Sequence, residues 1–201
     1  MPARLRSIDE PDVLEAALAL LQQGEAIAFP TDTVYGVGAA GLDSAAVGKL
    51  FVIKQRPLAQ AIPLLLADPE DLQNVCPVVP RVAAELAARY WPGGLTLVVP
   101  AAPQLPANLV AGGATVAVRI PDHPWLRQLI RRLGQPLAAT SANLHGGPNP
   151  ASADAVAEQL GERLPLIVDG GPTPGDVPST IVDTTGALPK ILRQGAVMIT
   201  F

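Results

Sequence analysis

The side chains best suited to chemistry in this sequence are two cations that follow a predicted helix. Val47 and Leu50 recur at helical spacing, and Lys54 continues the same stripe seven residues after Val47. Arg56 comes two residues later, just before Pro57 prevents any further helix. The spacing therefore predicts that Lys54 leaves the helix on its buried face and that Arg56 lies close to it.

A turn rich in hydroxyls precedes that helix. Residues 26–29 form a short apolar run, and residues 30–36 then bring threonines and Asp32 to its carboxyl end. Open α/β sheets bind ligands at that end of their strands. We therefore expect Thr31 and Thr33 to face the same site as the two cations.

Further polar residues follow or end predicted strands. They are Arg119, the stretch 140–143, Ser179 and Arg193. Taken singly, each has a structural explanation, since hydroxyls and amides are common in loops and Arg119 could pair with one carboxylate. The sequence offers no compact Ser-His-Asp pattern, histidine-rich metal cluster or paired catalytic carboxylates. Cations and hydroxyls together bind carboxylates and phosphates and stabilise charge that develops in phosphoryl or nucleotidyl transfer.

One apparent motif is rejected. Residues 36–41 match the dinucleotide-binding pattern G-x-G-x-x-G letter for letter. In that motif the glycines directly follow a strand and an acidic residue lies about twenty residues further on, and neither condition holds here. We expect these glycines to let the backbone turn sharply.

The elements that must position these residues are helices alternating with short strands. Asp43 or Ser44 is expected to cap the helix that ends at Lys54, and Asp122 to cap a later helix, in which Arg127, Arg131 and Arg132 form a solvated face. Residues 61–66 suit a strand that begins late or lies at an edge, because Pro63 interrupts them. Residues 115–120 alternate, which places Thr115 and Arg119 on one face, and residues 180–183 and 190–193 are expected to form a hairpin.

Composition limits the class of protein. A chain of 201 residues with 49% hydrophobic and 16% charged residues is expected to fold as one domain over residues 1–201. The net charge of −4 argues against strong nonspecific binding of nucleic acid, so tRNA binding is expected to be weak at most. Cys76 is the only cysteine, which excludes an intrachain disulfide. The chain shows neither an apolar leader nor a membrane span, and we expect a cytoplasmic protein.

Seven short segments, in chain order, carry a resemblance to a known family. They read PTDTVYG at 30–36, KQRP at 54–57, WPGGLTL at 91–97, VAVRIPDHP at 116–124, TSAN at 140–143, PSTIVD at 178–183 and ILRQG at 191–195. Together they resemble the YrdC family of threonylcarbamoyl-AMP synthases in its single-domain form. The resemblance spans nearly the whole chain.

The resemblance implies a fold and a reaction. The fold is a three-layer α/β arrangement, a mixed twisted sheet of about seven strands with helices on both faces and a concave ligand cavity. The reaction joins L-threonine, bicarbonate and ATP into threonylcarbamoyl-AMP and pyrophosphate, for the threonylcarbamoyladenosine modification of tRNA. ATP is a substrate, expected with Mg²⁺ and without a metal held by the protein. Other tRNA threonylcarbamoylation proteins are implied as partners.

The resemblance also implies roles for individual residues. Arg119 grips the carboxylate of threonine, and Lys54 lies close to the transferred phosphate. The residues implied for threonine are Thr33, Arg119, Ala139, Thr140 and Ser179. The residues implied for ATP are Arg56, Thr115, Ser141, Asn143, Asn149 and Arg193. The catalytic group comprises Lys54, Arg56, Ser141 and Asn143.

This chain departs from the family pattern at several positions, and two other classes of function are compatible with its residues. Many members carry Lys or Asn followed by Pro where this chain has Gln60 and Ala61, and some carry His where Leu65 stands. Longer members add a second domain whose linker covers the nucleotide. The alternatives are an RNA-binding module without turnover and a carbamoyl-transfer domain that uses carbamoyl phosphate. The zinc-finger and acylphosphatase segments that accompany such a carbamoyl-transfer domain are not found in this sequence.

Overall fold

The computed structural model describes residues 3–174 and 177–201, which form one mixed sheet with helices on both faces. The strands are β1 (Arg4–Ser7), β2 (Ile27–Phe29), β3 (Gly36–Ala40), β4 (Leu64–Leu65), β5 (Leu95–Pro100), β6 (Thr115–Arg119), β7 (Leu137–Ser141), β8 (Leu166–Asp169), β9 (Thr180–Asp183) and β10 (Lys190–Arg193). The α-helices are α1 (Val13–Gln22), α2 (Ser44–Lys54), α3 (Leu72–Val75), α4 (Arg81–Tyr90), α5 (Pro124–Leu133) and α6 (Ala153–Leu160). Two short 3₁₀ helices complete the set, η1 (Pro69–Asp71) and η2 (Gly161–Arg163).

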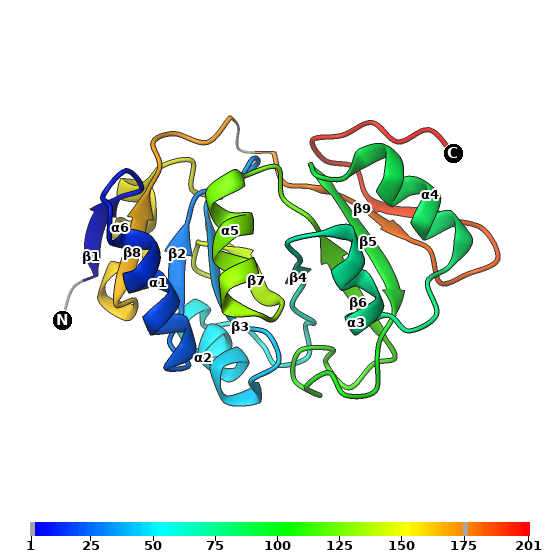
Figure 1. The fold of residues 1–201 in the computed structure, drawn as a ribbon, viewed down its shortest axis with the longest axis horizontal. Helices are drawn as coiled ribbons and strands as arrows, with labels where there is room; N and C mark the ends of the chain where they lie inside the picture. The colour runs from blue at the N-terminus through cyan, green and yellow to red at the C-terminus, as the bar shows by residue number, and fades with distance from the viewer. Residues whose placement is uncertain (1–2, 175–176) are drawn as a thin grey trace.

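The ten strands lie in the order β1-β8-β2-β3-β7-β4-β6-β5-β9-β10. The sheet runs along the long axis of the molecule, from β1 at one end to β9 near the other (Figure 1). Parallel pairs join β1 to β8, β2 to β8, β4 to β6 and β5 to β9, and the remaining neighbours are antiparallel. The predicted α/β class is confirmed, and so is the hairpin of β9 and β10. The sheet has ten strands, more than the family resemblance implies. The sequence predicts a strand within residues 61–66, where β4 lies, but it predicts neither β1 nor β3, because these short segments give little periodic signal.

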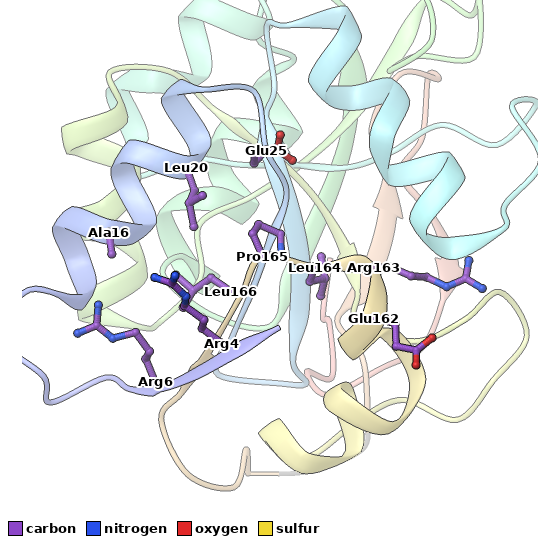
Figure 2. Close-up of a pocket in the computed structure, with 10 residues that line it drawn as sticks. All are labelled: Arg4, Arg6, Ala16, Leu20, Glu25, Glu162, Arg163, Leu164, Pro165 and Leu166. Carbon is purple, nitrogen blue, oxygen red and sulfur yellow. The ribbon is translucent and has the colours of Figure 1, made fainter. Parts of the chain in front are cut away.

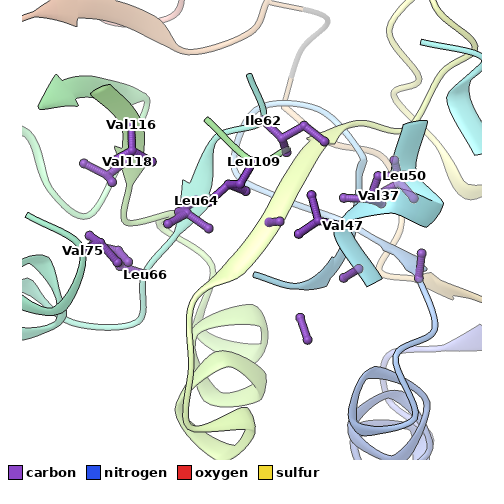
Figure 3. Packing of buried hydrophobic residues seen from close by; sticks show 14 of the residues in the cluster. Val37, Val47, Leu50, Ile62, Leu64, Leu66, Val75, Leu109, Val116 and Val118 are labelled. Carbon is purple, nitrogen blue, oxygen red and sulfur yellow. The ribbon is translucent and has the colours of Figure 1, made fainter. Parts of the chain in front are cut away.

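The two faces of the sheet are covered differently. One apolar cluster joins α2, α3, α4 and α6 to one face, and it includes alternate residues of β5 and β6. Val47 and Leu50 of α2 lie against Val37 of β3 in this cluster (Figure 3). The second cluster joins α1 and α5 to the other face, but only over β2, β7 and β8 and the adjoining Leu65. This cluster therefore does not cover the second face of β5 and β6.

Local signals explain where two of the helices begin. Asp43 caps α2 as predicted, because its Oδ1 accepts from the backbone N–H groups of Ala45 and Ala46. The predicted cap of α5 was wrong by one residue. His123, not Asp122, occupies that position, and its Nδ1 accepts from the backbone N–H of Leu126 at 3.4 Å.

Only one of the three glycines of the rejected motif lies in a turn as expected: Gly41 begins the turn after β3, whereas Gly36 and Gly38 lie within that strand. Residues 36–40 are strand β3, which pairs with β2 on one side and β7 on the other. A Cβ on Gly38 would lie 2.8 Å from the carbonyl oxygen of Ala138, and a Cβ on Gly41 would lie 2.7 Å from that of Pro136. These positions are glycine because neighbouring backbone approaches them too closely for a side chain.

Two other expectations are confirmed in part. The strand within residues 61–66 does begin late, at Leu64, but it lies in the interior of the sheet between β7 and β6. Arg131 and Arg132 of α5 are exposed as expected, whereas Arg127 is half-buried. All three also form ion pairs: Arg127 and Arg131 with Asp68, and Arg132 with Glu15. Among residues 3–174 and 177–201, no helix has the length and apolar character needed to cross a bilayer.

Substitutions at two glycines should distinguish the effect of close backbone approach on stability from the effect of helix propensity. We expect Gly38→Ala to lower the free energy of unfolding by about 1–3 kcal/mol, because the new methyl meets fixed backbone. Gly48→Ala is the matched control, since a Cβ on Gly48 of α2 meets only the Asn108 side chain at 3.9 Å. It should raise stability by about 0.4–1 kcal/mol. Equal effects of the two substitutions in chemical denaturation would contradict this account of β3.

Candidate functional site

A cavity of about 410 Å³ lies on the second face of the sheet. Thr96 and Val98 of β5 and Ala117 and Arg119 of β6 line it, and they alternate with the core residues of the same strands. The rest of the lining comes from β3, β4, β7, β9 and β10 and from the loops that precede or follow strands of the sheet. The complete set is Thr31, Thr33, Val34, Gly36, Arg56, Ala61, Pro63, Leu65, Thr96, Val98, Ala117, Arg119, Ala139, Thr140, Ser141, Asn149, Pro178, Ser179, Ile181, Leu192 and Arg193.

Most of the site residues predicted from the sequence meet in this cavity. The ones that line it are Thr33, Arg56, Arg119, Ala139, Thr140, Ser141, Asn149, Ser179 and Arg193. Three predicted residues do not line it. Lys54 and Asn143 are buried directly behind Ser141, whereas Thr115 is exposed at the start of β6, on the predicted face but beyond the lining.

Lys54 ends α2 as a buried ammonium without a carboxylate partner among the described residues. Its Nζ donates to the backbone oxygens of Ser141 and Asn143, at 2.5 and 2.6 Å, and to Asn143 Oδ1 at 2.9 Å. Ser141 Oγ donates to the same Oδ1 at 2.7 Å. Burial, and then the nearby charge of Arg56, lower the pKa of Lys54 to about 8. The ammonium thus fixes the segment after β7 beside the cavity.

Arg56 reaches the cavity because Gln55 ends α2 in the left-handed conformation, at φ 52°. Its Nη2 donates to the backbone oxygen of Ala61 at 2.7 Å, and its Nη1 donates to Thr140 Oγ1 at 3.3 Å. Its Nε is buried and has no hydrogen-bond partner. Burial lowers the pKa of Arg56. An unsatisfied donor on a buried cation favours the arrival of an acceptor.

Arg119 is held on three sides. Its Nε donates to the Gly93 oxygen at 2.9 Å, its Nη1 to Thr33 Oγ1 at 3.0 Å and its Nη2 to Asp32 Oδ1 at 2.6 Å. The side chains of Arg119 and Asp32 are only 8% and 15% exposed, so this ion pair is largely desolvated. The sequence argument placed Asp32 at the right strand end but gave it no role. Nothing in the spacing of residues 32 and 119 indicates their contact.

Ser179 and Arg193 form the opposite wall. Arg193 Nη2 donates to the backbone oxygen of Ser179 at 2.8 Å, and the Ser179 hydroxyl lies 2.7 Å from Thr96 Oγ1. Burial, and then the charge of Arg119, lower the pKa of Arg193. Thr96 was missed by the sequence argument. The alternation of Leu95 and Leu97, which are buried on the core side, could have found it.

The cavity is strongly cationic. Three guanidinium groups line it, and none of the described lining residues bears a carboxylate. Arg119 has an ion pair, whereas among residues 3–174 and 177–201 neither Arg56 nor Arg193 has one. Buried guanidiniums with open donors bind carboxylates and phosphates, often through two parallel hydrogen bonds. The arrangement can therefore hold more than one anion at once.

A second cavity, of about 640 Å³, lies between β1, α1 and the segment that precedes β8. Arg4 and Arg6 extend from β1 toward α1 there, and Glu162 and Arg163 lie at its far end (Figure 2). Arg6 is already paired with Glu10 and Asp12. Because this cavity carries mixed and largely compensated charge, we place the candidate site in the smaller, cationic one.

Two of the three positions that depart from the family pattern line the cavity. Gln60 is exposed and does not line the cavity. Ala61 lines it and contributes the backbone oxygen that accepts from Arg56. Leu65 also lines it, so an apolar side chain occupies the position where some family members carry histidine.

Comparison with known proteins identifies the family of this chain. A family model named for Sua5, YciO and YrdC, with the description "Telomere recombination", matches residues 19–195. The threonylcarbamoyl-AMP synthase of Bacillus subtilis (strain 168) is 43% identical over 192 residues, which cover 95% of this chain and 55% of that protein. The threonylcarbamoyl-AMP synthase of Vibrio parahaemolyticus is 38% identical over 187 residues, or 92% of this chain and 100% of that protein.

A solved structure agrees with these matches. The crystal structure of P. abyssi Sua5 complexed with L-threonine has a TM-score of 0.91 with this chain at 38% identity, over 97% of this chain and 58% of that one. The chain thus spans about half the length of its Bacillus and Pyrococcus relatives. The resemblance predicted from the sequence is confirmed.

The lowered pKa of Lys54 predicts how stability depends on pH. Its ordinary value is 10.5, so between about pH 8 and 10.5 the unfolded chain binds a proton that the folded chain has lost. The contribution of Lys54 to the free energy of unfolding must therefore rise with pH across that window. Relative to Lys54→Met, the free energy of unfolding of the wild-type protein should rise by about 1–3 kcal/mol between pH 7 and pH 10. A difference that stays flat in denaturant titrations over this range would contradict the burial of this ammonium.

Proposed function

This chain belongs to the Sua5/YciO/YrdC family, and on that basis we propose that it makes threonylcarbamoyl-AMP. The substrates are L-threonine, bicarbonate and ATP, and the other product is pyrophosphate. The reaction is a nucleotidyl transfer, because AMP passes from pyrophosphate to the carboxylated amino acid.

One observation of the site supports this proposal above the others. The cavity collects Arg56, Arg119 and Arg193, with Lys54 directly behind, and its described lining bears no carboxylate. The proposed reaction must bring a carboxylated amino acid and a triphosphate together against their mutual repulsion. Fixed cations in a partly desolvated cavity offset that repulsion at little reorganisation cost.

The threonine half of the site is proposed at Arg119 and the residues around it. Arg119 binds the α-carboxylate through the two N–H groups that the protein leaves open. The hydroxyls of Thr33 and Ser179 and the backbone at Ala139 and Thr140 surround the rest of the amino acid. Ser179 is oriented by Thr96, whose hydroxyl lies 2.7 Å away.

The ATP half is proposed directly beside the threonine half, since Arg193 donates to Ser179 and Arg56 donates to Thr140. Arg56 and Arg193 bind phosphate oxygens, and Ser141 and Asn149 contribute neutral hydrogen bonds. Asn143 and Lys54 act from behind this wall, where they hold the Ser141 segment and place a positive charge close to the transferred phosphate. Thr115 contacts ATP only if the nucleotide extends past the lining to the start of β6.

The chemistry follows in two steps. The amine of threonine bonds to the carbon of bicarbonate and water leaves, which gives a carbamate. A carbamate oxygen then attacks the α-phosphorus, and the bond to the bridging oxygen breaks as pyrophosphate departs. Lys54 and Arg56 stabilise the charge that develops on the α-phosphate in this second step.

Magnesium is expected with ATP, and the described residues do not offer it a site of their own. No group of three or more His, Cys, Asp or Glu side chains in residues 3–174 and 177–201 is placed to hold a metal ion. The phosphates of ATP would therefore be the ligands of the magnesium ion.

We also propose three wider properties of this protein. Residues 1–201 form a single domain, which the continuous ten-stranded sheet supports. The product supplies tRNA threonylcarbamoylation in the cytoplasm, through other proteins of that modification. Direct tRNA binding is weak, since Arg127, Arg131 and Arg132 are already paired with carboxylates.

Product analysis tests the proposed reaction directly. With ATP, threonine and labelled bicarbonate together, we expect pyrophosphate and a labelled adenylate in equal amounts. Omitting threonine or bicarbonate should abolish both products, because the nucleophile is the carboxylated amine. Formation of ADP, or turnover with carbamoyl phosphate in place of bicarbonate, would exclude this function and favour the carbamoyl-transfer class.

Arg56 offers a test of the phosphate half. Arg56→Ala should lower kcat about 10²- to 10³-fold, the usual effect of losing one preorganised contact to the transition state. Arg56→Lys should recover only part of this, because an ammonium cannot make the planar two-point contact of a guanidinium. Arg81→Ala is the control, since the Arg81 side chain is 93% exposed and pairs only with Glu85. Near-normal turnover of Arg56→Ala would show that the α-phosphate binds elsewhere.

A further inference from the structure

Asp32 forms an ion pair with Arg119, one of the arginines that line the cationic cavity. Its Oδ1 lies 2.6 Å from Nη2 of Arg119, and both side chains are largely buried. Asp32 does not line the cavity itself. It lies at the boundary with a neighbouring cavity of about 480 Å³, which it lines together with Asp122 and His123. A buried pair of this kind acts on whatever binds to the exposed side of the arginine.

The pair makes one of three guanidiniums electrically different from the others. Arg119 is compensated by Asp32, whereas no described residue forms an ion pair with Arg56 or Arg193. The proposed substrates differ in the same way. Threonine is a zwitterion with no net charge, and ATP and pyrophosphate are polyanions.

We propose that Asp32 is a specificity-determining residue that makes the Arg119 end of the cavity select a zwitterion over a simple anion. This inference rests on the proposed function, in which Arg119 binds the α-carboxylate of threonine. In threonine the ammonium is one carbon away from that carboxylate, so Asp32 lies within a few ångströms of it and attracts it. Asp32 also repels any anion that carries no ammonium group. This repulsion keeps phosphate groups at Arg56 and Arg193.

The geometry leaves room for both partners on Arg119. A guanidinium has five N–H groups, and Gly93, Thr33 and Asp32 each take one. Two N–H groups remain for a carboxylate. Asp32 therefore does not compete with the substrate for the last donors, and it sets the net charge that the substrate meets.

The test compares threonine with 3-hydroxybutanoate, which has the same carboxylate, hydroxyl and methyl but no ammonium. The KM of threonine and the inhibition constant of 3-hydroxybutanoate are measured for the wild-type protein and for Asp32→Asn. The ratio of the two constants isolates the interaction of the ammonium with residue 32, since every effect on the shared groups cancels. We expect the preference for threonine to fall at least about tenfold in Asp32→Asn, as one lost charge interaction at short range predicts.

Two further variants distinguish the loss of the Asp32 charge from a general loss of folding. Asp32→Glu restores the carboxylate and should recover most of the preference. Asp122→Asn makes the same substitution in the neighbouring cavity, at an exposed residue without a contact to Arg119, and should leave the preference unchanged. If Asp32→Asn turns over too slowly to assay, calorimetric binding of the same two compounds gives the ratio.

The outcomes distinguish a failure of this inference from a failure of the proposed function. If the wild-type protein binds and uses threonine but Asp32→Asn weakens both compounds equally, Asp32 has only a structural role and the inference is overturned. An equal loss of preference in Asp122→Asn would overturn it as well. If the wild-type protein neither binds nor uses threonine, the proposed function fails instead.

Discussion

The rest of the structure depends on one electrostatic constraint, the confinement of like charges in a partly buried cavity. The charge of Arg119 lowers the pKa of Arg193, and that of Arg56 lowers the pKa of Lys54, although burial is the larger cause in both cases. Arginines stay protonated even when they are buried, so this repulsion persists at neutral pH. Packing elsewhere must offset it. A bound anion would relieve it, which couples ligand binding to the stability of the site.

The sheet provides both the packing and the site. Its first face is covered by α2, α3, α4 and α6, while α1 and α5 cover only part of its second face. Alternation along β5 and β6 then sends leucines and valines into the core and Thr96, Ala117 and Arg119 into the cavity. The same two strands thus build the core and the wall of the site, because successive side chains of a strand point to opposite faces.

How much could be predicted differs between elements for physical reasons. The long periodic segments, such as α2 with its Asp43 cap, follow from local sequence because apolar spacing and capping act within a few residues. The interior position of β4 and the strand conformation of residues 36–40 could not be predicted in this way. Gly38 of β3 lies against the backbone of Ala138 in β7, about a hundred residues away in the chain, and β4 lies between two strands that are distant in sequence. Local propensity carries no information about such neighbours.

In the candidate site, too, some features follow from local sequence and others only from the fold. The sequence by itself determined the chemical character of this protein, since cations and hydroxyls at strand ends, in the order of a known family, indicate a site for two anions. The tertiary structure alone decided which of them meet: nine predicted residues line one cavity, Lys54 and Asn143 support it from behind, and Thr115 lies outside. It also brought Asp32 to Arg119 and Thr96 to Ser179. Such contacts join residues more than eighty positions apart, and they depend on how the whole sheet is ordered, which no local spacing encodes.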